Sequence, residues 1–294
     1  MSPLFDKAAI LLFRVMKFEV RLFPRKIDLF LGRFLGNCIY FLDRRHRRVA
    51  HKNIVIALGG SLPIPSMKKM ARASFLHFGE VFMDLIKFSL LSAKKQNSLL
   101  TISGESHLKE AAKGGKGILV VTAHYGNWEL GIIGLSKIGT VNVVARALDV
   151  EPLERELYKL RTGFGAKIIY KDQATRQVLR ALRNKEIVAL LIDQNVLREQ
   201  AIFVDFFGKQ AATTPALAAF HLRTKAPIIP AFCYPTREQA YHLELFKPVE
   251  VSLTDDYEAD VITITQKCTK VIEDRIRQEP RYWLWFHDRW RTQP

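Results

Sequence analysis

A histidine and a glutamate stand five positions apart directly after an apolar run, a setting suited to proton transfer. Residues 118–123 are apolar and rich in β-branched side chains, as in a short buried strand, and they lead into His124, with Glu129 following. An imidazole beside a carboxylate can act as a general base whose tautomer is held by its partner. Such pairs also occur as purely structural contacts, so their place in the fold decides their meaning.

The elements around this pair must bring its two side chains together. Gly126 and Asn127 favour a turn, and Asn127 can cap a helix that begins near Trp128, which places Glu129 in the first helical turn. On one continuous helix, residues five apart point roughly 140° away from each other. A strand, a turn and then a helix remove that difficulty, so we expect the imidazole of His124 and the carboxylate of Glu129 to meet.

From residue 117 onward, short apolar runs alternate with helical stretches, which predicts an α/β fold with a largely parallel sheet flanked by helices. The expected strands are 118–123, 141–145, 166–169, 187–192 and 228–234, and the expected helices lie near 128–137, 152–162, 173–184 and 213–224. Further strands are expected at 241–246 and 249–253, with a final helix at about 257–279.

Polar side chains follow three of the expected strands. Arg146 comes directly after the strand at 141–145, and Asp193 comes after the strand at 187–192. Ligands of open α/β sheets bind at the carboxyl ends of strands, so Arg146 and Asp193 are expected to converge with His124. The alternative is that Arg146 and Asp193 form a structural ion pair.

The N-terminal part is both apolar and basic. Residues 5–23 and 27–42 read as two amphipathic helices separated by Pro24. We interpret residues 1–45 as a membrane-associating extension that lies in the bilayer interface, and 46–294 as the α/β domain. A helical hairpin packed on that domain and a short spanning helix at 29–42 are the alternatives. A later helix is expected to run through Lys87, with Ser66 as its cap.

The composition narrows the class of partner. Lysine and arginine outnumber aspartate and glutamate by 45 to 29, a formal net charge of +16, while 48% of residues are hydrophobic. A basic surface implies an anionic partner, and the apolar content, without a nucleic-acid motif, favours a membrane surface over nucleic acid. The three cysteines lack metal-ligand spacing and are expected to be reduced thiols. No cleavable signal peptide is evident.

The sequence around the histidine resembles the H-x4-E signature of the late acyltransferases of lipid A biosynthesis, a branch of the glycerolipid acyltransferase superfamily. The resemblance covers nearly the whole chain. It extends through the motifs His124-Tyr-Gly-Asn-Trp-Glu129, Ala145-Arg146, Asp193-Gln-Asn195, Phe206-Phe-Gly-Lys209 with Thr213-Thr-Pro215, Ala226-Pro-Ile-Ile-Pro230 and Trp283-Leu-Trp-Phe-His-Asp-Arg-Trp290. One departure is that the family's arginine is often followed by proline, whereas Arg146 precedes alanine.

This resemblance implies an O-acyltransferase that moves a fatty acyl chain from acyl-acyl carrier protein to a hydroxyl of an anionic lipid A precursor of the Kdo-lipid IVA type. It implies the cytoplasmic face of the inner membrane and neither metal nor organic cofactor. His124 would deprotonate the hydroxyl, and Glu129 would orient His124. Arg146 and Asp193 match further polar positions, where Arg146 could bind a phosphate.

Several aromatic and basic residues have two interpretations. Asn127, Trp128 and Phe207 are taken as substrate-binding, although Trp128, Phe206 and Phe207 could equally fill the core. His221 is expected to be structural. A last set reads either as an interfacial aromatic and basic belt or as ordinary packing of the final segment: Trp283, Trp285, Trp290, Arg281, Arg289 and Arg291.

Three other functions compete with this one. An acyltransferase of the same superfamily could use another glycolipid or phospholipid acceptor, such as an ornithine-type lipid or a phosphatidylinositol mannoside. A non-catalytic membrane or nucleic-acid binding protein could use the basic face, but would not need polar residues gathered at strand ends. A hydrolase is disfavoured because the chain has no G-x-S-x-G elbow and no metal-ligand cluster.

Overall fold

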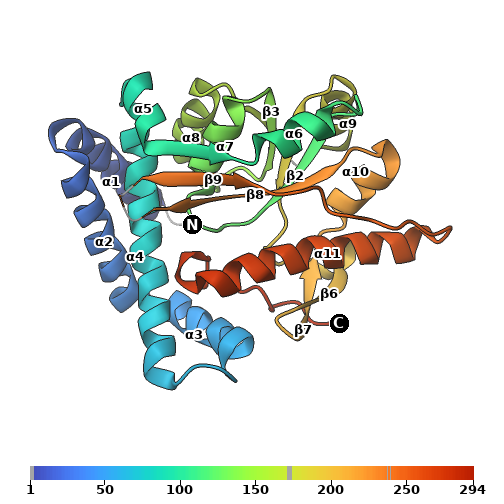
Figure 1. The fold of residues 1–294 in the computed structure, drawn as a ribbon. Coiled ribbons are helices and arrows are strands. Elements are labelled where there is room, and N and C mark those ends of the chain that lie inside the picture. The colour runs from blue at the N-terminus through green and yellow to red at the C-terminus, as the bar shows by residue number, and fades with distance from the viewer. Residues whose placement is uncertain (1–2, 171–173, 237, 239) are drawn as a thin grey trace.

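The computed structural model describes residues 3–170, 174–236, 238 and 240–294. Its centre is a seven-stranded sheet in the order β1-β9-β8-β2-β5-β3-β4 (Figure 1). The strands are β1 (Leu100–Ser103), β2 (Ile118–Thr122), β3 (Val141–Ala145), β4 (Lys167–Tyr170), β5 (Ile187–Leu191), β8 (Ile228–Pro235) and β9 (Tyr241–Leu245). Neighbouring strands are parallel except β8 and β9, which confirms the predicted α/β fold with a largely parallel sheet.

Helices cover the sheet and extend beyond it. They are α1 (Pro3–Leu22), α2 (Arg25–Leu42), α3 (Arg44–Leu58), α4 (Ile64–Ser89), α5 (Ala93–Leu99), α6 (Glu105–Ala112), α7 (Trp128–Ser136), α8 (Glu151–Gly163), α9 (Ala174–Arg183), α10 (Ala216–Thr224) and α11 (Tyr257–Gln278). Figure 1 shows α7 and α8 on one side of the sheet, α11 on the other, and the long α4 standing beside α1 and α2.

The two faces of the sheet are both buried, which is why its central strands are apolar without interruption. Along β2, Leu119 and Val121 join a core that includes residues of α9, α10 and α11. The alternate residues Ile118 and Val120 join a second core that includes residues of α6 and α7. The period of two along the strand therefore divides its side chains between two layers of helices.

Two expected local features are wrong, and one element was not expected. Residues 249–253 form no strand, because β8, to which Val249 donates a backbone hydrogen bond, is already flanked by β2 and β9. The helix expected to be capped by Ser66 begins at Ile64 after an extended Pro63. The antiparallel hairpin of β6 (Ile202–Phe206) and β7 (Lys209–Thr213) was not expected. The two residues of its turn, Phe207 and Gly208, both have positive φ. In the sequence, this type of hairpin is indicated by a glycine in a two-residue connection between strands.

The N-terminal helices pack on α4. Gly32 of α2 lies so close to α4 that an added Cβ would come 2.5 Å from the carbonyl oxygen of Gly79. Lys87 of α4 forms a buried ion pair with Asp28 of α2 at 3.1 Å. The outer surface of α1 and α2 exposes large apolar side chains, including Leu11, Leu12, Val15, Phe18, Phe30, Phe34, Phe41 and Leu42.

None of the described helices combines the length and the apolar composition that a bilayer span requires.

The last segment packs inside the protein. Trp283, Trp285, Trp290 and Arg289 are each 2% exposed or less, so the interpretation of this segment as an interfacial belt is wrong. Arg289 donates to the Thr213 hydroxyl and to a backbone carbonyl at the end of the β6–β7 hairpin. The aromatic rings of this segment pack with Phe206 on the same hairpin, which ties the end of the chain to the domain.

Candidate active site

His124 follows β2, and its imidazole is held by the carboxylate that follows β5. Because β2 and β5 are neighbours in the sheet, their carboxyl ends place His124 beside Asp193. His124 Nδ1 lies 2.9 Å from Asp193 Oδ1, and the backbone N–H of His124 donates to Asp193 Oδ2 at 3.0 Å. An ionised carboxylate can only accept, so Nδ1 carries the hydrogen and Nε2 is left as the basic nitrogen.

Asp193 is buried, and a third donor reaches it. The indole N–H of Trp283 donates to Asp193 Oδ2 at 2.8 Å. Burial alone would raise the pKa of Asp193, but the His124 imidazole and the hydrogen bonds from His124 and Trp283 outweigh it, and the pKa lies below its usual value. The carboxylate is therefore ionised at neutral pH and can stabilise an imidazolium at His124.

Glu129 occupies a different ion pair from the expected one. Both of its oxygens accept from the guanidinium of Arg161 on α8, with an Nε to Oε2 distance of 2.9 Å, and the Trp128 indole N–H donates to Oε1 at 3.1 Å. The expectation that Glu129 itself holds His124 is thus corrected. Its position in the first turn of α7 is as expected, but the turn directs its carboxylate toward α8.

A cavity of about 470 Å³ opens beside these groups. Its polar lining consists of His124, Trp128, Glu129, Arg146, Asp149, Arg161 and Gln194. The Gln194 side chain lies 3.4 Å from His124 Nε2, and the Trp128 ring stands 5.2 Å from the imidazole between centroids. The cavity therefore places a basic nitrogen, two arginines and an indole around one space.

A second, strongly apolar hollow borders this cavity; we call it the groove. It has a volume of about 750 Å³ and shares Phe78 and Phe82 of α4 with the cavity. Its remaining lining is Leu12, Met16, Leu35, Cys38, Ile39, Leu42, Asp43, His46, Phe75, Gly79 and Phe286. The Phe78 ring stands 5.4 Å from Trp128, so aromatic side chains connect the groove to the imidazole. Such a shape fits a flexible hydrocarbon chain that ends in a polar reacting group.

The model of one family, described as bacterial lipid A biosynthesis acyltransferase, matches residues 5–292. The chain belongs to this family. Among individual proteins, it is 25% identical over 275 residues to a lipid A biosynthesis lauroyltransferase of Escherichia coli, a match that covers 90% of this chain and 85% of that protein. It is 24% identical over 261 residues to a phosphatidylinositol mannoside acyltransferase of Mycobacterium tuberculosis, a match that covers 85% of this chain and 79% of that protein. A lipid A biosynthesis acyltransferase of Haemophilus influenzae is 25% identical over 223 residues, and this match covers 74% of this chain and 67% of that protein.

The remaining expected site residues of this acyltransferase lie in three different settings. Arg146 lines the cavity, is largely exposed and pairs with Asp149 at 2.7 Å, so the alternative of an ion pair between Arg146 and Asp193 is wrong. Asn127 is fully buried and caps α7 through a 3.1 Å bond from the Leu130 N–H. Phe207 is buried against Trp285 and Arg277 and does not line the cavity.

The sequence did not predict two contacts of this site, that of Arg161 with Glu129 and that of Trp283 with Asp193. Arg161 is one of several basic residues on α8, and nothing in its spacing separates it from Arg155 or Lys159. Trp283 was noticed, but its side chain reaches Asp193 from 90 residues further along the chain. Both contacts depend on how the sheet is ordered and how the final segment returns to it.

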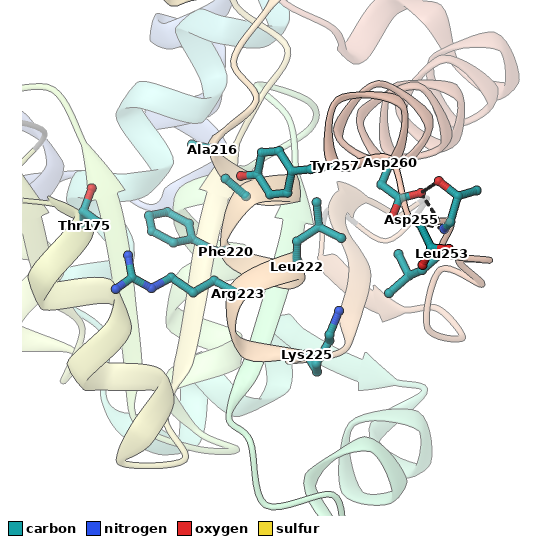
Figure 2. Close-up of a pocket in the computed structure, with 12 residues that line it drawn as sticks. Thr175, Ala216, Phe220, Leu222, Arg223, Lys225, Leu253, Asp255, Tyr257 and Asp260 are labelled. Atoms are coloured by element: carbon teal, nitrogen blue, oxygen red, sulfur yellow. Dashed lines mark hydrogen bonds between the residues drawn. The ribbon is translucent and has the colours of Figure 1, made fainter.

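Another hollow, between α10 and the start of α11, shares no lining residue with the cavity (Figure 2). Arg223 and Lys225 line it, and the hydrogen bonds drawn there join Thr254, just before α11, to Asp260 in the first turn of that helix. Across the described ranges there is also no grouping of three or more His, Cys, Asp or Glu that could hold a metal ion.

Proposed function

We propose that this chain transfers a fatty acyl group from acyl-acyl carrier protein to a hydroxyl of a lipid A precursor of the Kdo-lipid IVA type. The observation that carries the proposal is the arrangement of His124, with Nδ1 hydrogen bonded to buried Asp193 and Nε2 left as a base beside a cavity that borders an apolar groove. Membership of an acyltransferase family supports the type of reaction.

The reaction needs one proton carrier. His124 Nε2 takes the proton of the acceptor hydroxyl while Asp193 stabilises the imidazolium. The alkoxide oxygen attacks the thioester carbonyl and forms a tetrahedral intermediate whose oxyanion can be met by Gln194 and Arg146, which line the cavity. The carbon–sulfur bond then breaks, and the imidazolium returns its proton to the departing thiolate. The products are an ester and the free thiol of the carrier.

The groove is the proposed place of the acyl chain. Its lining is apolar apart from Asp43 and His46, and it borders the cavity at Phe78 and Phe82. A thioester carbonyl near His124 would therefore have its hydrocarbon tail directed along these two rings into the groove. Trp128 stands between the Phe78 ring and the imidazole.

Charge and surface composition support the proposed partners. The net charge of +16 suits both an acidic carrier protein and an anionic glycolipid. Phe18, Phe30 and Phe34 are more than half exposed on α1 and α2, and such aromatic surface next to basic side chains suits a bilayer interface. We propose that the enzyme works at the inner membrane, on its cytoplasmic face. Phe34→Asp should lower the fraction that sediments with anionic vesicles, whereas Ile262→Asp, on exposed α11 surface, should not.

A second acceptor class deserves a parallel test. The similarity to a phosphatidylinositol mannoside acyltransferase extends over 85% of this chain, so a mannosylated phospholipid is the alternative acceptor. Both acceptors are anionic glycolipids that carry hydroxyl groups, and the two proposals differ in which acceptor the cavity admits.

The deciding experiment is mass spectrometry of the lipid products formed by the purified chain. Acyl-carrier thioesters of several chain lengths, and the matching coenzyme A thioesters, are offered with a Kdo-lipid IVA acceptor or a phosphatidylinositol mannoside. We expect an ester of the first acceptor, formed from the carrier-bound donor. Product on the mannoside alone would replace the proposed acceptor, and equal use of coenzyme A thioesters would remove the proposed carrier dependence.

The same assay tests the base. His124→Ala should abolish transfer, whereas His107→Ala should retain it because His107 lies on α6, outside the cavity. Transfer by a folded His124→Ala variant would overturn the mechanism.

A further inference from the structure

We propose that Trp283 is a positioning residue for acyl transfer: its indole N–H fixes the Asp193 carboxylate so that Oδ1 faces His124 Nδ1. The inference rests on the proposed role of His124 as the base. It assigns a function to a side chain in the last segment that does not line the cavity.

The hydrogen bonds to Asp193 are divided between its two oxygens. Oδ2 accepts from Trp283 Nε1 at 2.8 Å and from the backbone N–H of His124 at 3.0 Å. Oδ1 is thereby turned to His124 Nδ1 at 2.9 Å. Rotation of the carboxylate about its Cβ–Cγ bond would break both bonds to Oδ2, so these two donors fix the direction of the bond to Nδ1.

The donor is itself held in place. The backbone of Trp283 forms a bridge with Tyr125 in the loop that carries His124, and the Ser74 hydroxyl of α4 donates to the Trp283 carbonyl at 2.7 Å. Its ring packs edge-on against Trp285 and Phe206, with centroids 4.7 and 5.5 Å away. The indole is 1% exposed, so water has no access to replace its N–H.

Loss of this N–H should act on the tautomer of His124. With a single donor left on Oδ2, the carboxylate can turn, and the hydrogen bond to Nδ1 weakens. The imidazole form with hydrogen on Nε2 then gains population, and that form cannot accept the proton of an acceptor hydroxyl. At metal-bound histidines, the groups that orient the imidazole through its second nitrogen are typically worth about 10- to 100-fold in function, and we expect a loss of the same order here.

The chain offers a matched control in the same aromatic cluster. Trp290 is 2% exposed, stacks on Phe206 and stands 6.3 Å from the Trp283 ring. Its indole nitrogen is buried and has no hydrogen-bond partner among the described residues. Trp283→Phe and Trp290→Phe thus remove the same atoms from one core, but only the first removes a hydrogen bond to Asp193.

The experiment compares kcat and KM for these two variants with the unmodified chain. We expect Trp283→Phe to lower kcat by about 10- to 100-fold with KM nearly unchanged, and Trp290→Phe to lower it far less. Nitrogen-15 NMR of histidine-labelled protein should show the His124 hydrogen moving from Nδ1 toward Nε2 in Trp283→Phe alone. Equal kinetic losses in the two variants, with no change in the tautomer, would overturn the inference.

A double-mutant cycle distinguishes positioning from packing. If Trp283 acts through Asp193, Trp283→Phe adds little to the loss already caused by Asp193→Asn; a packing role would give the same added loss in both backgrounds. Should Trp283→Phe not fold, replacement of Trp283 by β-(3-benzothienyl)alanine keeps the ring shape and exchanges the N–H for sulfur. If His124→Ala retained transfer, the proposed role of His124 as the base would fail, while the NMR measurement of the His124 tautomer would still test the contact between Trp283 and Asp193.

Discussion

Asp193, 69 residues further along the chain, holds the imidazole of His124 through a 2.9 Å bond between Oδ1 and Nδ1. The glutamate of the H-x4-E motif is engaged elsewhere, because both oxygens of Glu129 accept from Arg161. The two carboxylates have separate tasks in this arrangement. Asp193 orients the imidazole of His124, whereas Glu129 fixes α8 against the start of α7, beside the cavity wall formed by Trp128.

Asp193→Asn should lower transfer on the order of 10³-fold with the fold intact. An asparagine amide can turn its N–H₂ toward Nδ1, which favours the wrong imidazole tautomer. The measurement is kcat with a saturating thioester donor, together with the circular dichroism spectrum. Asp274→Asn, an exposed change on α11, is the control. A loss of less than about tenfold for Asp193→Asn would show that His124 does not depend on this carboxylate.

Arg161→Met should destabilise the protein by about 3–5 kcal/mol, because it leaves the carboxylate of Glu129 buried without its cation. Adding Glu129→Gln should recover part of that loss. Urea unfolding gives the free energies. Arg155→Met on the same helix is the control, since its ion pair with Glu151 is exposed and should contribute little. Equal effects of the two arginine substitutions would contradict a structural role for the Arg161–Glu129 pair.

Stability should fall as the pH drops from about 6.5 to about 4. Burial lowers the pKa of His77 to about 4, while its unfolded value stays near 6.5, so the unfolded chain binds more protons within that window. Stability therefore rises with pH there, by up to about 1.4 kcal/mol per unit for this one group. His77→Gln, whose amide can still donate to the Gly126 carbonyl, should flatten the slope measured by urea unfolding at several pH values. An unchanged slope would mean that His77 is not buried as the neutral form.

Cys38→Phe should shift the products toward shorter acyl chains. Cys38 of α2 lines the groove, and a phenyl ring there would fill volume that a hydrocarbon tail needs. The check is the chain-length distribution of the lipid product formed from a mixture of donors. Ile262→Phe on the exposed side of α11 serves as the matched enlargement outside the groove. An identical distribution in all three proteins would place the acyl chain elsewhere.

The sequence allowed the strands β2, β3, β4, β5, β8 and β9 to be predicted, but not β1 or the β6–β7 hairpin. Buried parallel strands are continuous apolar runs, and polar residues interrupt them where they end. His124, Arg146 and Asp193 were found in this way. Which of them touch could not be predicted, since contact depends on strand order. β5 lies next to β2 although two strands intervene in the chain, and that adjacency selects Asp193 as the partner of His124.

The prediction for the last segment, which contains Trp283, Trp285 and Trp290, was wrong for a related reason. Tryptophan beside arginine has the same composition in a membrane belt and in a core, and only the location of the segment separates the two. Arg289 is buried because Thr213 and backbone carbonyls accept its hydrogen bonds, partners that lie more than 70 residues away and leave no local trace in the sequence.

The distribution of the four tryptophans gives the protein a built-in optical reporter. Trp283, Trp285 and Trp290 are enclosed in the core, whereas Trp128 lines the cavity and stands between Phe78 and His124. The three enclosed indoles should emit at short wavelength whatever is bound. A change in fluorescence when a thioester or glycolipid is added would come chiefly from Trp128, so occupancy of the cavity can be followed without a label.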